Sequence, residues 1–359
     1  MKRGESMKFL DLFSGIGGFR LGMEQAGHES VGYVEIDKFA RKSYESIFAT
    51  KGEWTANDIT TISDDDIRCI RDKGRIEIIC GGFPCQAFSV AGKRGGFDDA
   101  RGTLFFEIAR IANIIRPRYL FLENVKGLLS HDKGITFETI LRTMDEIGYD
   151  AEWQVLNSKD FGVPQNRERV FIIGHLRGGG TRKIFPIESE INEHSTFEKS
   201  TEAAVARTFT AGGNSAGNHS GMTMIKLAGH LDIKGQENIR RVYDTGGISP
   251  SLTTMEGGNR QPKIYQSVLT PERENKRQNG RRIKDPNEPM FTLTSQDRHG
   301  VSDGYRIRKL TPRECWRLQG FPDWAFDKAK EVNSDSQLYK QAGNSVTVNV
   351  IYAIAKKLG

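Results

Sequence analysis

Cysteine is scarce in this chain, and its few copies are not spaced as metal ligands or as a disulfide framework. The 359 residues include four cysteines, Cys69, Cys80, Cys85 and Cys315. They form no CxxC pair, and no histidine stands at ligand spacing from them, which argues against a zinc site. We therefore expect free thiols and no bound metal.

Long apolar runs are absent as well. No run approaches the roughly 18 residues that would span a bilayer. At the start of the chain, Glu5 and Asp11 interrupt the apolar stretch that a secretory signal needs. The composition, with 37% hydrophobic and 27% charged residues, is typical of a soluble globular protein. The sequence thus predicts a cytoplasmic protein without membrane contact.

Acidic residues do not balance the basic ones, and the positive excess is local. The formal net charge is +6, and residues 181–310 hold 20 Lys or Arg against 15 Asp or Glu. Within that segment, residues 260–309 hold 12 basic and 6 acidic residues. A basic segment beside a nearly neutral remainder predicts a module that binds a polyanion, with a solvated, loop-rich surface as the alternative.

Over the first half of the chain, short β-prone runs alternate with helical ones. The candidate strands are residues 8–13, 31–36, 76–80, 119–122, 151–156 and 170–176. The clearest helix is 103–115, where Leu104, Ile108, Ile111 and Ile115 fall on one stripe. This alternation predicts an α/β fold with a doubly wound, mostly parallel sheet, which binds ligands at the carboxyl ends of its strands.

The pattern changes after the glycine run at 178–180. Three Thr-rich pieces follow, at 206–214, 249–259 and 290–297, and each leads into turn residues. They predict a second, smaller domain of strands and loops, and a chain of this length has room for two domains. Helical patterning returns from Leu310, so we expect the last helix to pack back on the first domain.

A glycine-rich turn, DLFSGIGGFRLG at 11–22, follows the first candidate strand. It does not fit the dinucleotide fingerprint G-x-G-x-x-G, because Arg20 stands where the third glycine belongs. The next strands end near Glu35, Asp37 and Asp58, acids that suit ribose hydroxyls. With no Lys or Arg in the core of the turn, these acids favour an adenosyl ligand without phosphate, S-adenosylmethionine, over a dinucleotide.

The stretch GGFPCQAFS, residues 81–89, places Cys85 in a loop at the end of a buried strand. A free cysteine is more often a small buried hydrophobe, a reading that suits the other three cysteines better. A thiolate nucleophile needs partners, and Glu123 in ENV and the pair Arg167 and Arg169 in QNRER stand at neighbouring strand ends. They converge only if the sheet order brings these ends together.

The chain closely resembles the DNA (cytosine-5)-methyltransferases of bacterial restriction-modification systems. The resemblance rests on the ordered segments DLFSGIGGFR, VEID, NDIT, GGFPCQAFS, RGTLFFEI, ENV, QNRER, RKLTPRECWRLQGFP and QAGNSVTVNVI. It covers about residues 1–177 and 306–359, and it implies a Rossmann-like, S-adenosylmethionine-dependent methyltransferase fold.

The resemblance also implies a covalent mechanism. Cys85 would attack carbon 6 of a flipped-out cytosine, while Glu123 holds and protonates ring nitrogen 3, which requires a pKa raised by burial. Arg167 and Arg169 would grip the pyrimidine oxygen and steady the site, with Gln165 in support. Carbon 5 would then take the methyl group of S-adenosylmethionine, leaving S-adenosylhomocysteine. Loss of the carbon 5 proton and of the thiolate would restore the ring.

Further residues are assigned by the same resemblance. The cofactor pocket would comprise Phe13, Gly15, Ile16, Gly17, Gly18, Glu35, Ile36, Asp58, Ile59, Pro84, Leu104, Asn344 and Ser345. Duplex DNA would meet Gln86, Ser89, Lys93, Arg94, Arg101, Gln236, Arg240, Arg241, Ser251 and Leu252. Segment 91–102 would be the mobile catalytic loop, with an ordinary surface loop as the alternative.

The family's Thr-Leu signature has two candidates in this chain. Ser251-Leu252 stands in the segment that resembles family members locally, and Thr292-Leu293 keeps both residue types. The residues leave open which pair lies at the flipped base.

For the domains, we expect 1–185 plus 340–359 to bind the cofactor and catalyse, 186–305 to recognise the target, and 306–339 to form a hinge. The resemblance implies a monomer acting on duplex DNA in the bacterial nucleoid, paired with an endonuclease of the same site. Two alternatives stay open, a tRNA cytosine-5 methyltransferase and a sequence-specific DNA binder without catalysis.

Overall fold

The computed structural model describes most of the chain in two separate compact units. The described residues are 6–84, 104–188, 283–284, 288–294, 299–302 and 307–359, with the backbone of three strands at 227–230, 241–243 and 266–269. Unit 1 comprises Met1–Asn192, Thr292–Gln296 and Thr311–Gly359, and unit 2 comprises Glu193–Phe291 and Asp297–Leu310. The chain therefore leaves unit 1 twice and returns to it twice.

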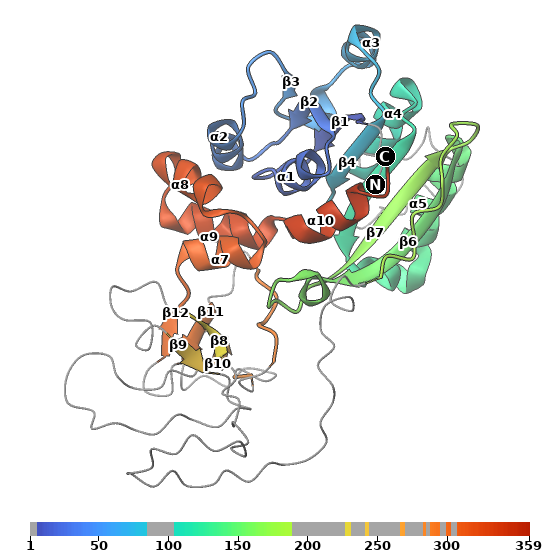
Figure 1. Ribbon diagram of the computed structural model, residues 1–359. Coiled ribbons are helices and arrows are strands. Elements are labelled where there is room, and N and C mark those ends of the chain that lie inside the picture. Colours follow the sequence, from blue (N-terminus) through green and yellow to red (C-terminus); the bar gives the residue numbers. More distant parts are fainter. Residues whose placement is uncertain are drawn as a thin grey trace, which may run out of the picture. The chain divides into compact units, whose positions relative to one another are not determined.

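Unit 1 is built on a seven-stranded sheet (Figure 1). Its strands are β1 (Lys8–Leu12), β2 (Glu29–Val34), β3 (Trp54–Ala56), β4 (Ile78–Gly82), β5 (Tyr119–Val125), β6 (Tyr149–Asn157) and β7 (Glu168–Leu176). They lie in the order β3-β2-β1-β4-β5-β7-β6. The first five are parallel, whereas β7 runs antiparallel to both β5 and β6. The predicted α/β fold with a mostly parallel sheet is confirmed.

Helices cover both faces of this sheet. Those before the middle of the chain are α1 (Gly18–Gln25), α2 (Lys38–Ile47), α3 (Asp64–Lys73), α4 (Leu104–Ile115) and α5 (Ile135–Glu146). The later ones are α7 (Pro312–Leu318), α8 (Asp323–Val332), α9 (Asp335–Asn344) and α10 (Val348–Ala355). Short 3-10 turns are η1 (Ile59–Thr61), η4 (Lys126–Leu129), η5 (His131–Gly134) and η6 (Ser158–Phe161).

The two faces of the sheet bury separate sets of side chains, because successive strand residues point in opposite directions. On one face, Leu10 and Leu12 of β1 join a cluster with α3, α4 and α5. On the other face, Phe9 of the same strand joins α1 and α10. Parallel strands that are covered on both sides consist of nearly continuous apolar residues, and such runs can be recognised in the sequence.

The return of the chain to its first helix depends on small residues. A Cβ atom on Gly22 of α1 would stand 2.7 Å from Ile351 Cβ in α10, closer than carbon atoms pack. A Cβ atom on Gly18 would similarly stand 2.8 Å from Val346 Cγ2. The glycines therefore let the last helix lie directly against α1, as expected from its apolar stripe.

The segment expected to be a hinge, 306–339, is mostly helical. Residues from 311 onward belong to unit 1 and form α7, α8, α9 and α10. Trp316 is fully buried, and its ring centroid lies 5.1 Å from that of Phe321 and 5.6 Å from that of Phe326. These aromatic contacts pack α7 against α8 within unit 1, and the hinge stays a prediction.

Unit 2 is described by its strands. A two-stranded antiparallel sheet pairs β8 (Leu227–His230) with β9 (Arg241–Tyr243). A three-stranded antiparallel sheet has the order β10 (Gln266–Leu269), β11 (His299–Ser302), β12 (Ile307–Lys309). The Thr-rich pieces 206–214 and 249–259 lie outside the described residues.

In the described part of the chain, no helix has the length and apolar character to cross a membrane.

Asp11 is a fully buried carboxyl in the middle of unit 1. Burial raises its pKa to about 8, and the nearby positive charge of Arg20 opposes this shift only in part. The Tyr44 hydroxyl donates to Asp11 Oδ2 over 3.5 Å, and the Cys80 thiol donates to Oδ1 over 3.9 Å. These long contacts leave the ionised carboxylate poorly compensated.

Replacing Asp11 by asparagine should therefore raise the melting temperature, and the gain should grow between pH 5 and pH 8. In the unfolded chain the carboxyl ionises near its ordinary pKa of about 4, whereas the folded protein keeps the proton to about 8. Within this window stability falls as the pH rises, a loss that asparagine avoids. Thermal unfolding at both pH values measures the gain, which should reach at least about 3 °C at pH 8.

Asp65→Asn, at an exposed position of α3 with 90% of its side chain accessible, is the control and should show no such trend. A gain at Asp11 that is equal at the two pH values would contradict this account.

Candidate active site

A cavity of about 500 Å³ lies within unit 1, at the carboxyl ends of the parallel strands. It is lined by Phe13, Gly15, Ile16, Val34, Glu35, Ile36, Asp37, Ala40, Asn57, Asp58, Ile59, Gly82, Phe83, Pro84, Leu104, Glu123, Asn124, Val125, Arg167, Arg169, Lys340, Gln341, Gly343, Asn344 and Ser345. The strand ends thus converge on one site, as the fold class predicts.

The glycine turn after β1 supports a carboxylate at one end of this cavity. The Gly15 N–H donates to Glu35 Oε2 over 2.7 Å, and the Asp37 N–H donates to Oε1 over 2.8 Å. Burial raises the pKa of Glu35, while these backbone donors act in the opposite direction. The carboxylate is held in one orientation, and each oxygen keeps further acceptor capacity toward the cavity.

Asp37 and Lys340 form the adjoining wall. Asp37 Oδ1 accepts from the backbone N–H groups of Phe39 and Ala40 and so caps the start of α2. Its other oxygen, Oδ2, accepts from Lys340 Nζ of α9 over 2.6 Å. Gln341, the next residue, donates to the Phe39 carbonyl over 3.0 Å. Helix α9 is thereby fastened across the helix that follows Glu35.

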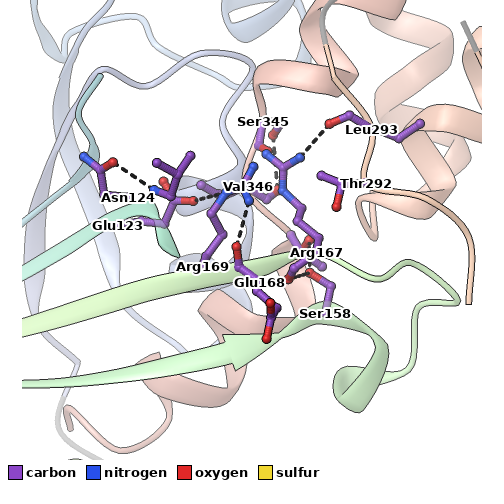
Figure 2. A network of polar contacts seen from close by, with 12 residues as sticks. Glu123, Asn124, Ser158, Arg167, Glu168, Arg169, Thr292, Leu293, Ser345 and Val346 are labelled. Atoms are coloured by element: carbon purple, nitrogen blue, oxygen red, sulfur yellow. Dashed lines mark hydrogen bonds and ion pairs between the residues drawn. The ribbon is translucent and has the colours of Figure 1, made fainter. Parts of the chain in front are cut away.

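A second carboxyl, Glu123, lies near the end of β5 in the same cavity (Figure 2). It is 7% exposed, and burial raises its pKa against the opposing charges of Arg169 and Arg167. The Arg169 Nε lies 3.0 Å from Glu123 Oε1. β7 is antiparallel to β5 and pairs Arg169 with Val125, which brings the arginine beside the acid.

Arg167 faces backbone carbonyls, and within the part of the chain that the structure describes it is paired with no carboxylate. Its Nη1 donates to the Leu293 carbonyl over 2.9 Å, and its Nη2 donates to Ser345 and Gly343 over 2.7 and 3.2 Å. Figure 2 shows the guanidinium between Leu293 and Ser345. With 3% of the residue exposed, burial lowers its pKa to about 9. A side chain that directly precedes β7 thus joins two segments that are distant in sequence.

Gln165 completes the contact with Thr292-Leu293. It is fully buried, accepts from the Leu293 N–H over 3.0 Å and donates to the Leu318 carbonyl over 2.8 Å. The Thr292 hydroxyl donates to the Asn166 carbonyl. Of the two candidate Thr-Leu pairs, the structure places Thr292-Leu293 at the QNRER segment, and Ser251-Leu252 lies outside the described residues.

Most of the expected cofactor residues line the cavity, together with Glu123, Arg167 and Arg169. Gly17 and Gly18 do not line it. A Cβ atom on Gly17 would stand 2.2 Å from the Phe48 ring, so this glycine serves packing. Gln165 lies behind the cavity wall, in contact with Leu293.

The predicted nucleophile and the predicted DNA-contacting residues fall on parts of the chain that are not described. Cys85, Gln86, Ser89, Lys93, Arg94, Arg101, Gln236, Arg240, Ser251 and Leu252 lie outside the described residues, and Arg241 is described only as backbone in β9. The described chain reaches Pro84, which lines the cavity. Cys85 therefore stays a prediction.

Asp37, named above with Glu35 as an acid that suits a ribose, lines the cavity, and several lining residues were not expected, notably Asn57, Phe83, Asn124 and Lys340. Each of these four stands within a few positions of an expected residue, in NDIT, GGFP, ENV or YKQAGNS. Proximity to a motif was thus the available signal. Among the described residues, no group of three or more His, Cys, Asp or Glu is placed to hold a metal ion.

Comparisons with known proteins agree with this geometry. Residues 7–359 match the family described as C-5 cytosine-specific DNA methylase. The orphan methyltransferase M.SPBetaI of Bacillus phage SPbeta is 38% identical over 436 residues, covering 98% of this chain and 97% of the relative. The type II methyltransferase M.HhaI of Haemophilus parahaemolyticus is 36% identical over 362 residues, with 98% and 94% covered.

A solved structure supports the fold. The S. pombe Dnmt2 methyltransferase aligns with a TM-score of 0.62 at 18% identity, covering 99% of this chain and 98% of the neighbour. At this identity the match bears on the architecture alone.

Replacing Arg167 by lysine should lower the free energy of unfolding by about 2 to 4 kcal/mol. Lysine keeps the charge, but a single ammonium cannot reach all three carbonyls that the guanidinium holds. Urea unfolding measures the change.

The matched control is Arg177→Lys, because Arg177 is 46% exposed between Asp145 and Asp150 and its ion pairs are screened by water. Equal losses in the two variants would show that the carbonyl contacts of Arg167 do not matter.

Proposed function

The chain belongs to the C-5 cytosine-specific DNA methylase family, and we propose that its cavity transfers a methyl group from S-adenosylmethionine to carbon 5 of a flipped-out cytosine in duplex DNA. The observation that carries this proposal is the pairing of Glu123 with Arg169 in the same cavity as Glu35. One carboxyl suits the sugar of the cofactor and the other suits a pyrimidine ring. The two ligands would therefore meet in one site.

The residues present fit S-adenosylmethionine. Glu35 offers a fixed carboxylate for the ribose hydroxyls, and the apolar side chain of Ile36, 69% exposed, offers a surface for a purine ring. The glycine turn between Phe13 and Gly18 contains no Lys or Arg for a phosphate. When bound, the cofactor would supply the electrophilic methyl group that becomes attached to carbon 5.

Glu123 would hold the cytosine and lend it a proton. Because burial raises its pKa, its carboxyl can hydrogen-bond to ring nitrogen 3 and protonate it as the thiolate of Cys85 bonds to carbon 6. The electron pair displaced by this attack makes carbon 5 nucleophilic. After methylation, carbon 5 loses its proton, the bond to sulfur breaks, and ring nitrogen 3 returns its proton to Glu123, which restores the aromatic ring, the free thiolate and the protonated carboxyl.

The arginines would divide the remaining work. Arg169 contacts Glu123 directly and is placed to grip the pyrimidine oxygen beside it. Arg167, with Gln165, would steady the site through Leu293 and Ser345. We infer that Thr292-Leu293 is the family's Thr-Leu pair in this chain, because both of its residues contact the QNRER segment.

Duplex DNA fits this proposal because a paired base cannot reach a buried carboxyl, so the cytosine must rotate out of the helix at a cost of a few kcal/mol. The basic residues of 91–102 and of the segment between 181 and 310 would contact phosphates. The SPbeta relative is named an orphan and the Haemophilus relative a type II enzyme. Because the two names differ in this respect, a partner endonuclease stays a prediction. The monomeric state also stays a prediction.

Cys85→Ser should abolish methyl transfer to duplex DNA while leaving DNA binding intact, because serine lacks a thiolate. Transfer of labelled methyl groups and a gel-shift assay measure the two properties. Cys69→Ser, at an exposed free cysteine, is the control and should keep full activity.

DNA carrying 5-fluorocytosine should trap the wild-type protein covalently. Carbon 5 then carries fluorine in place of the proton that must leave, so the bond between Cys85 and carbon 6 cannot be released. Undiminished methyl transfer by Cys85→Ser would refute the thiolate mechanism. Methyl transfer to tRNA in place of duplex DNA would refute the proposal that duplex DNA is the substrate.

Glu35→Gln should raise the dissociation constant for S-adenosylmethionine by roughly 10- to 100-fold, the worth of hydrogen bonds to a charged group. The amide cannot accept equally well from Gly15 and Asp37 and still receive both ribose hydroxyls. Isothermal titration measures the affinity.

Glu45→Gln is the matched control, because Glu45 is an exposed residue of α2 that accepts from Tyr33. Unchanged affinity in Glu35→Gln would remove the ribose assignment.

A further inference from the structure

Asn124, the middle residue of ENV, connects the Glu123 strand to the segment that leads to Cys85. We propose that Asn124 is a positioning residue that fixes the backbone of Phe83 and Pro84 and thereby sets the place of the Cys85 thiol relative to Glu123. This inference rests on the proposed role of Cys85. It assigns a task to a buried amide that the mechanism above does not use.

The contact extends the sheet by one hydrogen bond. The register of β4 and β5 ends with Gly82 opposite Glu123. One residue further along, the Asn124 side chain donates from Nδ2 to the Phe83 carbonyl over 2.8 Å. Asn124 is 2% exposed, so water does not compete for this bond. A side chain thus ties down the first residue after β4.

The orientation of the Asn124 amide follows from its second contact. The Val125 N–H donates to Asn124 Oδ1 over 2.8 Å, so the oxygen is occupied and the amino group must face Phe83. Aspartate has nearly the same shape but no donor, and it would place negative charge against the Phe83 carbonyl. The site therefore distinguishes asparagine from its closest isostere.

Two further features carry the constraint toward Cys85. Pro84 follows Phe83 directly, and its ring fixes φ, so the orientation of the Phe83 peptide is passed on along the chain. Gly82 precedes Phe83, and a Cβ atom there would stand 2.8 Å from Glu123 Oε2. The start of the segment is thus packed against the acid, and a shift of Phe83 changes the separation between acid and thiol.

The test compares Asn124→Ala and Asn124→Asp with Asn349→Ala. Asn349 of α10 makes a bond of the same kind, donating from Nδ2 to the Phe161 carbonyl over 2.8 Å, and it does not line the cavity. Each variant is measured for kcat of methyl transfer, for the dissociation constant of S-adenosylmethionine, and for the rate at which 5-fluorocytosine DNA becomes covalently attached.

Both Asn124 variants should lose roughly 10- to 100-fold in kcat and in the rate of covalent attachment, the effect of misplacing a reacting group by about 1 Å. Their affinity for S-adenosylmethionine should fall by much less than kcat does, because Glu35 is not disturbed and Pro84 only borders the cofactor pocket. Asn349→Ala should keep wild-type kcat even where its melting temperature falls. A merely structural role of Asn124 would not lower kcat and the attachment rate while sparing cofactor affinity and the activity of Asn349→Ala.

The proposal is overturned if kcat and the attachment rate in Asn124→Ala or Asn124→Asp stay within about twofold of wild type, or if Asn349→Ala loses as much as they do. Should Asn124→Ala fail to fold, Asn124→Asp, which preserves volume, decides by the same criteria. Failure of the proposed function is distinguishable, because it would appear as full activity in Cys85→Ser, whereas failure of this inference leaves Cys85 essential.

Discussion

The structure of this site depends on one guanidinium that contacts three backbone carbonyls. Arg167 joins β7 to Leu293 and to the segment of Gly343 and Ser345, which lie 126, 176 and 178 residues away in sequence. Its burial is costly, as the lowered pKa indicates, and the carbonyl contacts compensate for it. Because the chain leaves and re-enters unit 1 around these residues, this interaction holds the later segments against the strands that carry the acids.

Two buried carboxyls in one cavity acquire different tasks from their surroundings. Burial raises the pKa of both Glu35 and Glu123. Backbone N–H groups fix both oxygens of Glu35, which suits a carboxylate that binds hydroxyls. Glu123 instead faces the charged side chain of Arg169, which suits a carboxyl that exchanges a proton with its ligand. This difference comes from the sheet order. Glu35 follows β2, beside the glycine turn after β1, whereas Glu123 stands in β5, beside β7 and Arg169.

Sequence patterns predicted six of the seven strands in the unit 1 sheet, all but the short β3, and most of the cavity lining, because apolar runs and strand ends are local features of the sequence. Contacts between residues that are distant in sequence could not be predicted in this way. Lys340 contacts Asp37, and Arg167 contacts Leu293, only because the fold brings them together. A backbone carbonyl such as that of Phe83 is present in every residue, so the residue type does not show that it is a binding partner. Nothing in the sequence indicated how Trp316 is buried, since its aromatic partners are set by tertiary packing.

The central claim is that one cavity brings a methyl donor and a cytosine ring together so that carbon 5 is methylated. The most direct test is to incubate the protein with duplex DNA and S-adenosylmethionine carrying a labelled methyl group, digest the DNA to nucleosides and identify the labelled one. The account predicts label in 5-methyldeoxycytidine alone. Label on an exocyclic amino group of cytosine or adenine, or none in duplex DNA, would contradict it.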